Sequence, residues 1–332
     1  MAAEKIQRML EVRERIMVTH ERVDVFDALA WLDVQVVFKP LDGLLGAYIR
    51  GDHPGVMIST RRPLSVQRFT AAHELGHAVM KHEPSLDSPN VLRRAAMGYK
   101  SRTPMGFASY LQEIEADAFA GAFLLPNWLI THHANKHGWT RSDLAKEDII
   151  YQLSLRCGAS YQATVWALER NGIISAGARS LLLDTEPKYL KQRVGHVRGA
   201  AETKCDAWVL NEGDDKADIA INVGDTVTVD LKQQAGAGYL WITEAEAPAS
   251  LTKIDTSVAM NPEIPGAPSS KRAFYRADDE GSISLPFAHK RPWERDPVGE
   301  VAFNLKIMKP ERGLSRANRI RQRLGRDGID AR

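Results

Sequence analysis

The hydrophobic periodicity of this 332-residue chain changes near residues 195–204, and this change limits the folds that the chain can adopt. Before it, apolar residues mostly recur at the three- and four-residue spacing of helices; after it, they alternate with polar residues as in half-buried strands. The length also exceeds that of one ordinary domain. We therefore predict a multidomain α+β protein whose carboxy-terminal part is all-β.

The amino-terminal half combines helices with a few short extended runs. Apolar residues at helical spacing indicate helices over residues 1 to about 33, 65–81 and about 111–125. Apolar runs bounded by glycines and prolines indicate strands at 34–38, 44–49 and 56–59. The simplest assembly is a small antiparallel sheet packed with helices. Residues 82–109 are polar and indicate a long surface loop of the kind that often shapes a cleft.

The pentapeptide HELGH occupies positions 73–77, in the middle of a predicted helix. Residues four apart project from one face, so the imidazoles of His73 and His77 can reach a single ion, with Glu74 beside them. The opposite side of the helix is apolar. A chance pentapeptide in a chain with ten histidines is the alternative, and the apolar helical frame argues against it.

A catalytic zinc site needs a third protein ligand and keeps one open position. The next helix, EIEADAFAGAFLLP from residue 113, offers carboxylates. Glu113 and Asp117 share a face, whereas Glu115 points to nearly the opposite side. We expect Glu113 as the ligand and Asp117 as the group that orients a histidine through its other ring nitrogen, with Glu115 as the less favoured ligand. We expect surface or packing roles for the other histidines, which include His82, His132 and His133, although one of them could polarise a substrate carbonyl or steady an oxyanion.

The segments RFTAAHELGHAVMKH and EIEADAFAGAFLLP together resemble the ImmA/IrrE metallopeptidases, over about residues 20–180. The resemblance implies a zincin-like helical core and cleavage, inside the cell, of a regulatory protein such as a DNA-binding repressor. It makes His73, His77 and Glu113 the ligands of one zinc ion, or of another divalent metal, and Glu74 the general base. Asp117 stands where asparagine is common in that family.

Residues 142–174 have the spacing of a helix-turn-helix pair, with Gly158 in the turn. The second helix offers only Arg170 as a cation, so a structural or partner-docking pair is favoured over DNA readout. The last 22 residues carry seven arginines against three acidic residues. A solvated tail is the favoured interpretation, and a basic helix that touches nucleic acid or an acidic partner is the alternative.

The alternating strands after residue 204 predict an immunoglobulin-like β-sandwich. Its segments INVGDTVTVDLKQQAGAGYLW, KRPWERD and GEVAFNLKIMK resemble the chagasin-type inhibitors of papain-like cysteine peptidases. Those inhibitors place three loops in the cleft of their target. The resemblance puts the first loop at 234–239, with Gly238 and Tyr239, the second near Gly266, and the third at Arg291, Pro292 and Trp293.

Two of these loops depart from the family pattern. The first loop lacks the proline and both threonines, and the second lacks the doubled glycine. The third loop is intact, and an exposed Trp293 beside Arg291 would suit a binding anchor; a core tryptophan is the alternative. We therefore favour a protein-binding sandwich over cysteine-peptidase inhibition or a pure scaffold.

Composition adds limits on compartment and partners. A net charge of +2 does not argue for nucleic acid as a global partner. Without an apolar stretch that could span a bilayer or serve as a signal peptide, the chain is expected in the cytoplasm and not in a membrane. Cys157 and Cys205 have no CxxC spacing and are expected as reduced thiols.

We predict four segments: a metallopeptidase core at 1–135, a helix-turn-helix-like segment and linker at 136–195, a chagasin-like sandwich at 203–310 and a basic tail at 311–332. The favoured function is a zinc endopeptidase that cleaves a repressor and binds a protein partner through its sandwich. The alternatives are a non-catalytic binding or cysteine-peptidase-inhibiting module and a transcriptional regulator. Full retention of HExxH favours the enzyme, because a structural zinc would not need Glu74.

Overall fold

The structure, a computed structural model, describes residues 21–49, 54–82, 86–87, 107–195, 205–243, 248–259 and 269–309. Within these ranges the chain forms two compact units. Unit 1 contains residues 21–131 and 153–179, and unit 2 contains residues 132–152 and 180–309. The fold is α+β, with a helical first part that carries a small sheet and a sandwich at the carboxy-terminal end. The predicted domain boundaries stay a prediction, and the basic tail lies outside the described residues.

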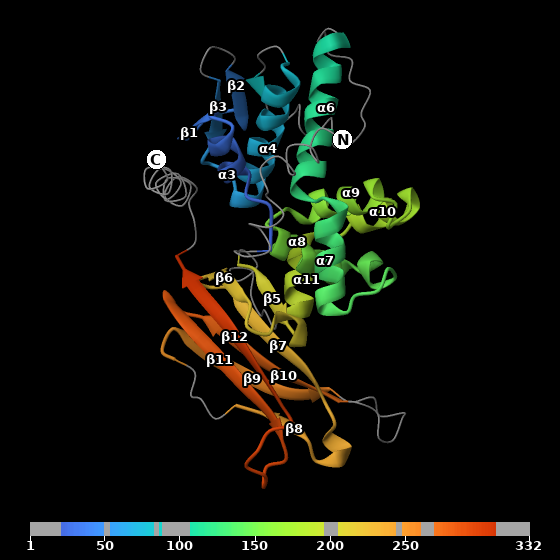
Figure 1. Ribbon diagram of the computed structural model, residues 1–332, viewed down its shortest axis with the longest axis vertical. Helices are drawn as coiled ribbons and strands as arrows, with labels where there is room; N and C mark the ends of the chain where they lie inside the picture. Colours follow the sequence, from blue (N-terminus) through green and yellow to red (C-terminus); the bar gives the residue numbers. More distant parts are fainter. Residues whose placement is uncertain are drawn as a thin grey trace. The chain divides into compact units, whose positions relative to one another are not determined.

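Unit 1 contains a four-stranded sheet and the helices packed on it (Figure 1). Its strands are β1 (Gln35–Lys39), β2 (Gly46–Ile49), β3 (Gly55–Ser59) and β4 (Leu86–Asp87), in the order β1-β3-β2-β4. Asp24 is the N-cap of helix α3 (Val25–Trp31), and its carboxylate accepts hydrogen bonds from the Phe26 and Asp27 amides. Such a cap satisfies amides that have no partner within the helix.

The sheet is mixed, so the prediction of an antiparallel sheet was wrong for one strand pair. Strand β1 pairs with β3 in parallel, while β2 is antiparallel to both β3 and β4. The reason is that the β2–β3 hairpin inserts β3 between β1 and β2. Strands β1 and β2, which are consecutive in the sequence, are therefore not neighbours in the sheet.

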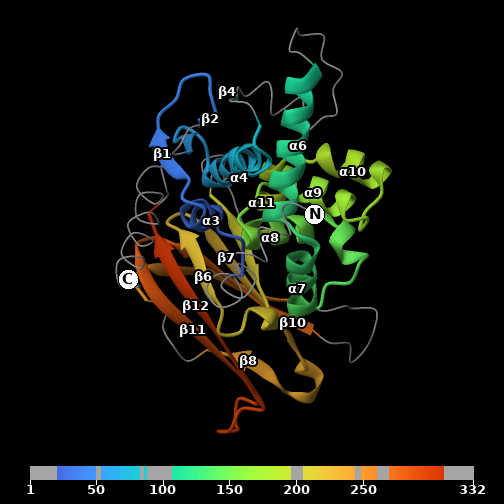
Figure 2. The same ribbon diagram turned by 45° about the horizontal axis from the view of Figure 1, so that its top comes forward.

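Two helices of unit 1 carry the residues of the predicted metal site. Helix α4 (Leu64–Met80) follows Pro63 and ends at Lys81, which has a left-handed backbone conformation. Helix α6 (Phe107–Leu124) is rich in alanine and lies beside α4 (Figure 2). Pro126 separates α6 from α7 (Asn127–His137). None of the helices in the described ranges is long and apolar enough to cross a membrane.

The predicted helix pair is present as α8 (Glu147–Cys157) and α9 (Tyr161–Arg170), with Gly158 at φ +66° in the turn. Helices α10 (Ala176–Leu183) and α11 (Pro187–Val194) follow. In unit 2, Tyr151 and Gln152 of α8 hydrogen-bond to the strand β5 (Ala207–Leu210). The first part of α8 is therefore tied to the sandwich through polar side chains.

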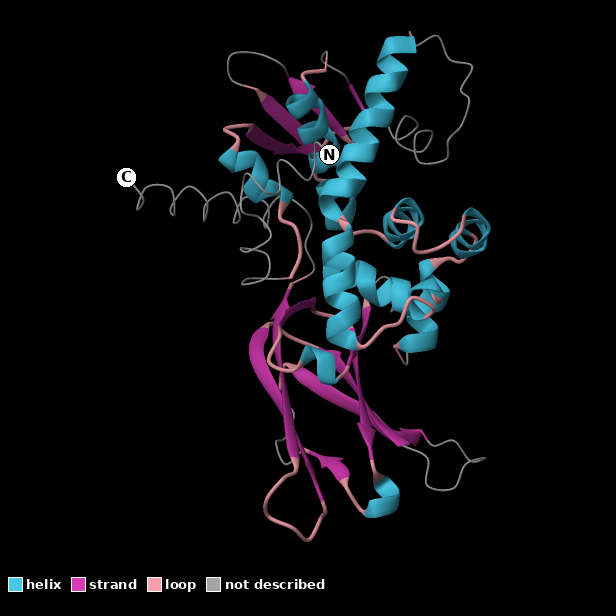
Figure 3. Ribbon diagram, turned by 45° about the vertical axis from the view of Figure 1, so that its right-hand side comes forward, coloured by secondary structure: helices cyan, strands magenta, loops and turns pink. Residues whose placement is uncertain are grey.

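The strands of unit 2 form two four-stranded sheets (Figure 3). One has the order β5-β7-β10-β9, with β7 (Thr226–Gln233), β10 (Ser269–Ala277) and β9 (Leu251–Ala259). The other has the order β6-β12-β11-β8, with β6 (Asp218–Asn222), β12 (Gly299–Met308), β11 (Gly281–Lys290) and β8 (Leu240–Ile242). Alternate residues of both sheets are buried, among them Val229, Leu231, Tyr275, Phe287, Phe303 and Leu305.

Candidate metal centre

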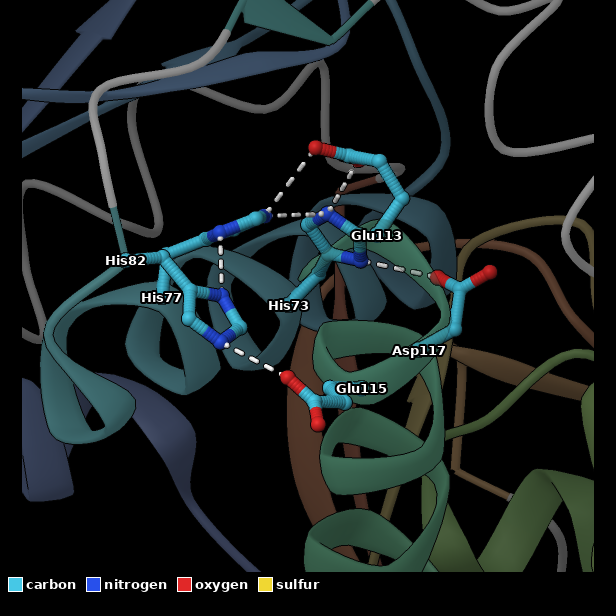
Figure 4. Close-up of polar contacts among 6 residues, drawn as sticks. All are labelled: His73, His77, His82, Glu113, Glu115 and Asp117. Carbon is cyan, nitrogen blue, oxygen red and sulfur yellow. Dashed lines mark hydrogen bonds and ion pairs between the residues drawn. The ribbon is translucent and has the colours of Figure 1, made fainter. Parts of the chain in front are cut away.

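The side chains of His73 and His77 lie on one face of α4 and meet Glu113 of α6 (Figure 4). The Nε2 atoms of the two histidines are 3.0 Å apart. Glu113 Oε2 lies 3.2 Å from His73 Nε2, and Glu113 Oε1 lies 3.6 Å from His77 Nε2. The four-residue spacing and the second helix thus bring three donor groups together, as the sequence analysis expected.

These donors suit a zinc ion in both chemistry and spacing. Two imidazole nitrogens and one carboxylate form a common catalytic zinc set. With bonds of about 2.0–2.1 Å, a tetrahedral ion holds its ligand atoms about 3.3 Å apart. The three separations in this cluster bracket that value, so the side chains could hold the ion without a change of backbone.

The site is deeply buried. His73, Glu74 and His77 are fully buried, and Glu113 is 3% exposed. The four-residue spacing identified the face of α4 that carries these residues, but it could not show that α6 and β2 pack against α4 there. A buried site strengthens electrostatic interactions between the ion and its ligands, because little water screens them.

Asp117 contacts the ring nitrogen of His73 that faces away from the donor cluster. Its Oδ1 lies 2.8 Å from His73 Nδ1, and its side chain is 14% exposed. If Nδ1 carries the proton and donates to Asp117, then Nε2 keeps a lone pair directed at the cluster. The supporting role expected for Asp117 needs such a contact, and the role itself stays a prediction.

The contacts that His82 and Glu115 make near the cluster were missed by the sequence analysis. His82 Nδ1 lies 2.9 Å from His77 Nδ1, and His82 Nε2 lies 3.1 Å from Glu115 Oε2 (Figure 4). His82 is 6% exposed, so it is not a surface histidine. Glu115 does not belong to the donor cluster, which agrees with its lower rank as a ligand. The spacing of five residues between His77 and His82 gave no signal for this contact, because residues five apart on a helix project from different faces.

The small size of Gly76 allows α4 and α6 to approach each other. A Cβ built at Gly76 would lie 3.2 Å from Ala116 Cα and 3.2 Å from Phe119 Cβ. That is closer than an ordinary van der Waals contact. Gly76 therefore helps to set the distance between the histidine pair and Glu113.

In the sandwich, residues of the first and third loops contact each other. The Arg291 guanidinium lies 4.5 Å over the Tyr239 ring and donates to the Ala237 carbonyl. Gly238 has φ +81°, and Trp293 lies beside it with 73% of its surface exposed. Trp293 is thus not a core tryptophan. Pro292 follows Arg291 in the same loop, and the second loop, near Gly266, lies outside the described residues.

Together these features define the class of each part: an α+β domain with a buried HExxH helix, and a β-sandwich. Comparison with known families agrees. Residues 31–169 match the IrrE N-terminal-like domain of the M78 peptidases, and residues 220–307 match the chagasin family of peptidase inhibitors. Both resemblances stated in the sequence analysis are confirmed.

Individual proteins are similar to separate parts of the chain. An uncharacterized immunity region protein of Bacillus phage phi105 is 23% identical over 134 residues, which are 40% of this chain and 77% of the phage protein. The cysteine protease inhibitor EhICP2 of Entamoeba histolytica aligns with 22% identity and a TM-score of 0.28, over 30% of this chain and 93% of the inhibitor. Amebosin aligns with 19% identity and a TM-score of 0.26, over 30% of this chain and 95% of its own.

Proposed function

We propose that this protein is a zinc-dependent endopeptidase that cleaves a regulatory protein, such as a helix-turn-helix transcriptional repressor. The observation that supports the proposal most is the meeting of His73, His77 and Glu113 around one point, with Glu74 on the same helix. The match of residues 31–169 to a peptidase family supports the same reaction class. The similarity to a phage immunity region protein supports a repressor as the substrate.

The roles of the side chains follow from their positions. His73, His77 and Glu113 would hold the ion, which when bound supplies Lewis-acid polarisation of the scissile carbonyl. Glu74 would accept a proton from the attacking water and deliver it to the leaving amine. Asp117 would keep His73 in the orientation that its ligand role requires.

Elemental analysis and a cleavage assay test this proposal together. The assay uses repressors encoded next to the gene as substrates. We expect one zinc per chain in the wild type and in Glu74→Gln, and a cleavage rate lower by about 10²–10⁴-fold in Glu74→Gln, the range that a general base contributes. We expect Glu113→Ala to lose both the metal and the activity. Wild-type turnover in Glu74→Gln, or full metal content in Glu113→Ala, would refute the assigned roles.

A second role, binding of a protein by the sandwich, is supported by the exposed Trp293 beside the Arg291–Tyr239 pair. Cysteine-peptidase inhibition is the narrower form of this role, because residues 220–307 match an inhibitor family while the first loop departs from its pattern. A papain inhibition assay with the full chain and with Trp293→Ala separates the two. If the wild type inhibits papain and Trp293→Ala does not, the sandwich acts as a cysteine-peptidase inhibitor. If the wild type does not inhibit papain, binding of another protein is the role that is left.

A further inference from the structure

We propose that His82 and Glu115 form a hydrogen-bonded relay that positions His77 as a metal ligand. This inference rests on the metal site of the proposed function. It adds a pair of positioning residues to that site: Glu115 holds His82, and His82 holds His77.

The direction of each hydrogen bond follows from the geometry. The Nε2 atom of His77 faces the donor cluster, so a ligand role needs the lone pair on that atom. A neutral imidazole with a free Nε2 carries its proton on Nδ1, which would donate to His82 Nδ1 at 2.9 Å. His82 then carries its own proton on Nε2 and donates it to Glu115 Oε2 at 3.1 Å. Each ring nitrogen of His77 and His82 then has one role, as a hydrogen-bond donor or as the carrier of a lone pair.

The relay matches the contact made by the other histidine of the pair. His73 is held by the carboxylate of Asp117 through Nδ1, at 2.8 Å. His77 reaches a carboxylate through one intervening imidazole. Asp117 of α6 would thus fix the tautomer and ring orientation of His73, and His82 in the turn after α4 would fix those of His77.

The end of α4 places His82 for this contact. Lys81 has φ 58° and ψ 40°, a left-handed conformation that residues with a side chain rarely adopt. The turn lets the His82 amide donate to the His77 carbonyl at 3.0 Å and brings the two imidazoles together. The centroids of the two rings are 4.9 Å apart.

Zinc affinity is the readout, measured at one fixed pH by competition with a chromophoric chelator. We expect His82→Ala to weaken zinc binding by about 10–100-fold, the range seen when a partner of a metal-ligating histidine is removed. Glu115→Ala should weaken it less, because 60% of the Glu115 side chain is exposed and water can replace it. Glu115→Gln should stay near the wild type, since its amide oxygen still accepts from His82.

Two controls separate positioning from a general structural effect. Lys81→Gly changes the same turn but suits the left-handed backbone, so its zinc affinity should equal that of the wild type. Thermal melting of the metal-free variants reports their folding. In zinc-loaded wild type, nitrogen-15 NMR should show His77 with a protected Nδ1–H, and this signal should be lost in His82→Ala.

The outcomes distinguish the relay from the site itself. A wild-type chain that binds no zinc would refute the metal site. A wild-type chain that binds one zinc, with equal affinity in His82→Ala, would overturn the relay alone. A loss of affinity in His82→Ala that Lys81→Gly shares, or that follows earlier melting of the metal-free chain, would also overturn it.

Discussion

Gly46 on β2 lies directly against the Glu74 carboxylate: a Cβ built at residue 46 would stand 2.6 Å from Glu74 Oε1 and 3.1 Å from the Met57 carbonyl oxygen. Gly46 also pairs with Ile58 on one side and Asp87 on the other, so its backbone has little freedom to withdraw. The strand therefore bounds the space in which Glu74 sits. Only a residue without a side chain leaves that carboxylate in place.

Gly46→Ala should slow cleavage while zinc stays bound. The added methyl group would collide with the Thr70 methyl group and with the Glu74 carboxylate, and a shift of that carboxylate by about 1 Å can cost up to ~10²-fold in rate. Gly55→Ala on β3 is the matched control, because its Cβ would meet nothing closer than 3.5 Å. The measurements are turnover number and metal content. Unchanged turnover in Gly46→Ala, or loss of its zinc, would contradict this role.

Gly76→Val should weaken zinc binding by moving α4 away from α6. Extra side-chain atoms in a packed contact typically cost about 1–3 kcal/mol of stability, and here they would also separate the histidines from Glu113. Zinc affinity and thermal melting would both be measured. Gly177→Val in α10 is the control, since nothing lies closer than 3.9 Å to its Cβ. A Gly76→Val protein that binds zinc like the wild type would show that the helix spacing does not set the site.

The site could be predicted from the sequence as far as local geometry determines it. The placement of His73 and His77 on one face follows from helical spacing alone. The choice of Glu113 needed only the periodicity of a second helix and the requirement for a third ligand. The contact of His82 with His77 depends on the left-handed backbone of Lys81, and a lysine gives no signal for that conformation.

The fold was predictable to a similar depth. Alternating apolar residues identified the strands around residues 219–231 and 283–307, because one side of each is buried. Strand β9 was missed because, after Leu251, its residues are exposed and give no alternation. The parallel pairing of β1 with β3 is set by contacts distant in the chain, which local patterns do not encode.

The stability of unit 2 should fall as pH rises toward neutrality, because of Asp225. This carboxyl is 2% exposed, and burial, helped by the nearby Asp206 carboxylate, raises its pKa from 3.8 to about 7. The folded state then holds the proton more tightly than the unfolded chain does. Its contribution to the free energy of unfolding is complete below about pH 4 and is lost as pH rises to about 7.

Thermal melting of the full chain between about pH 5 and about pH 8 checks this prediction, with Asp225→Asn as the variant that identifies the group. Asp225→Asn should flatten the pH dependence, because its amide does not titrate. The variant should also be less stable at low pH, since Asp225 accepts from the Asp206 and Asn222 amides and an asparagine oxygen can serve only one. An equal slope in the variant would assign the pH dependence to another group.

The two cysteines should differ in their reaction with thiol reagents. Neither forms a disulfide, but Cys157 is buried and Cys205 is partly exposed. Burial raises the pKa of the Cys157 thiol to about 12, so almost none of it is the reactive thiolate near neutral pH. The folded chain should therefore consume one equivalent of reagent quickly, and the denatured chain two. Cys205→Ser should remove the fast reaction and Cys157→Ser should keep it; fast labelling of folded Cys205→Ser would mean that unit 1 opens around Cys157.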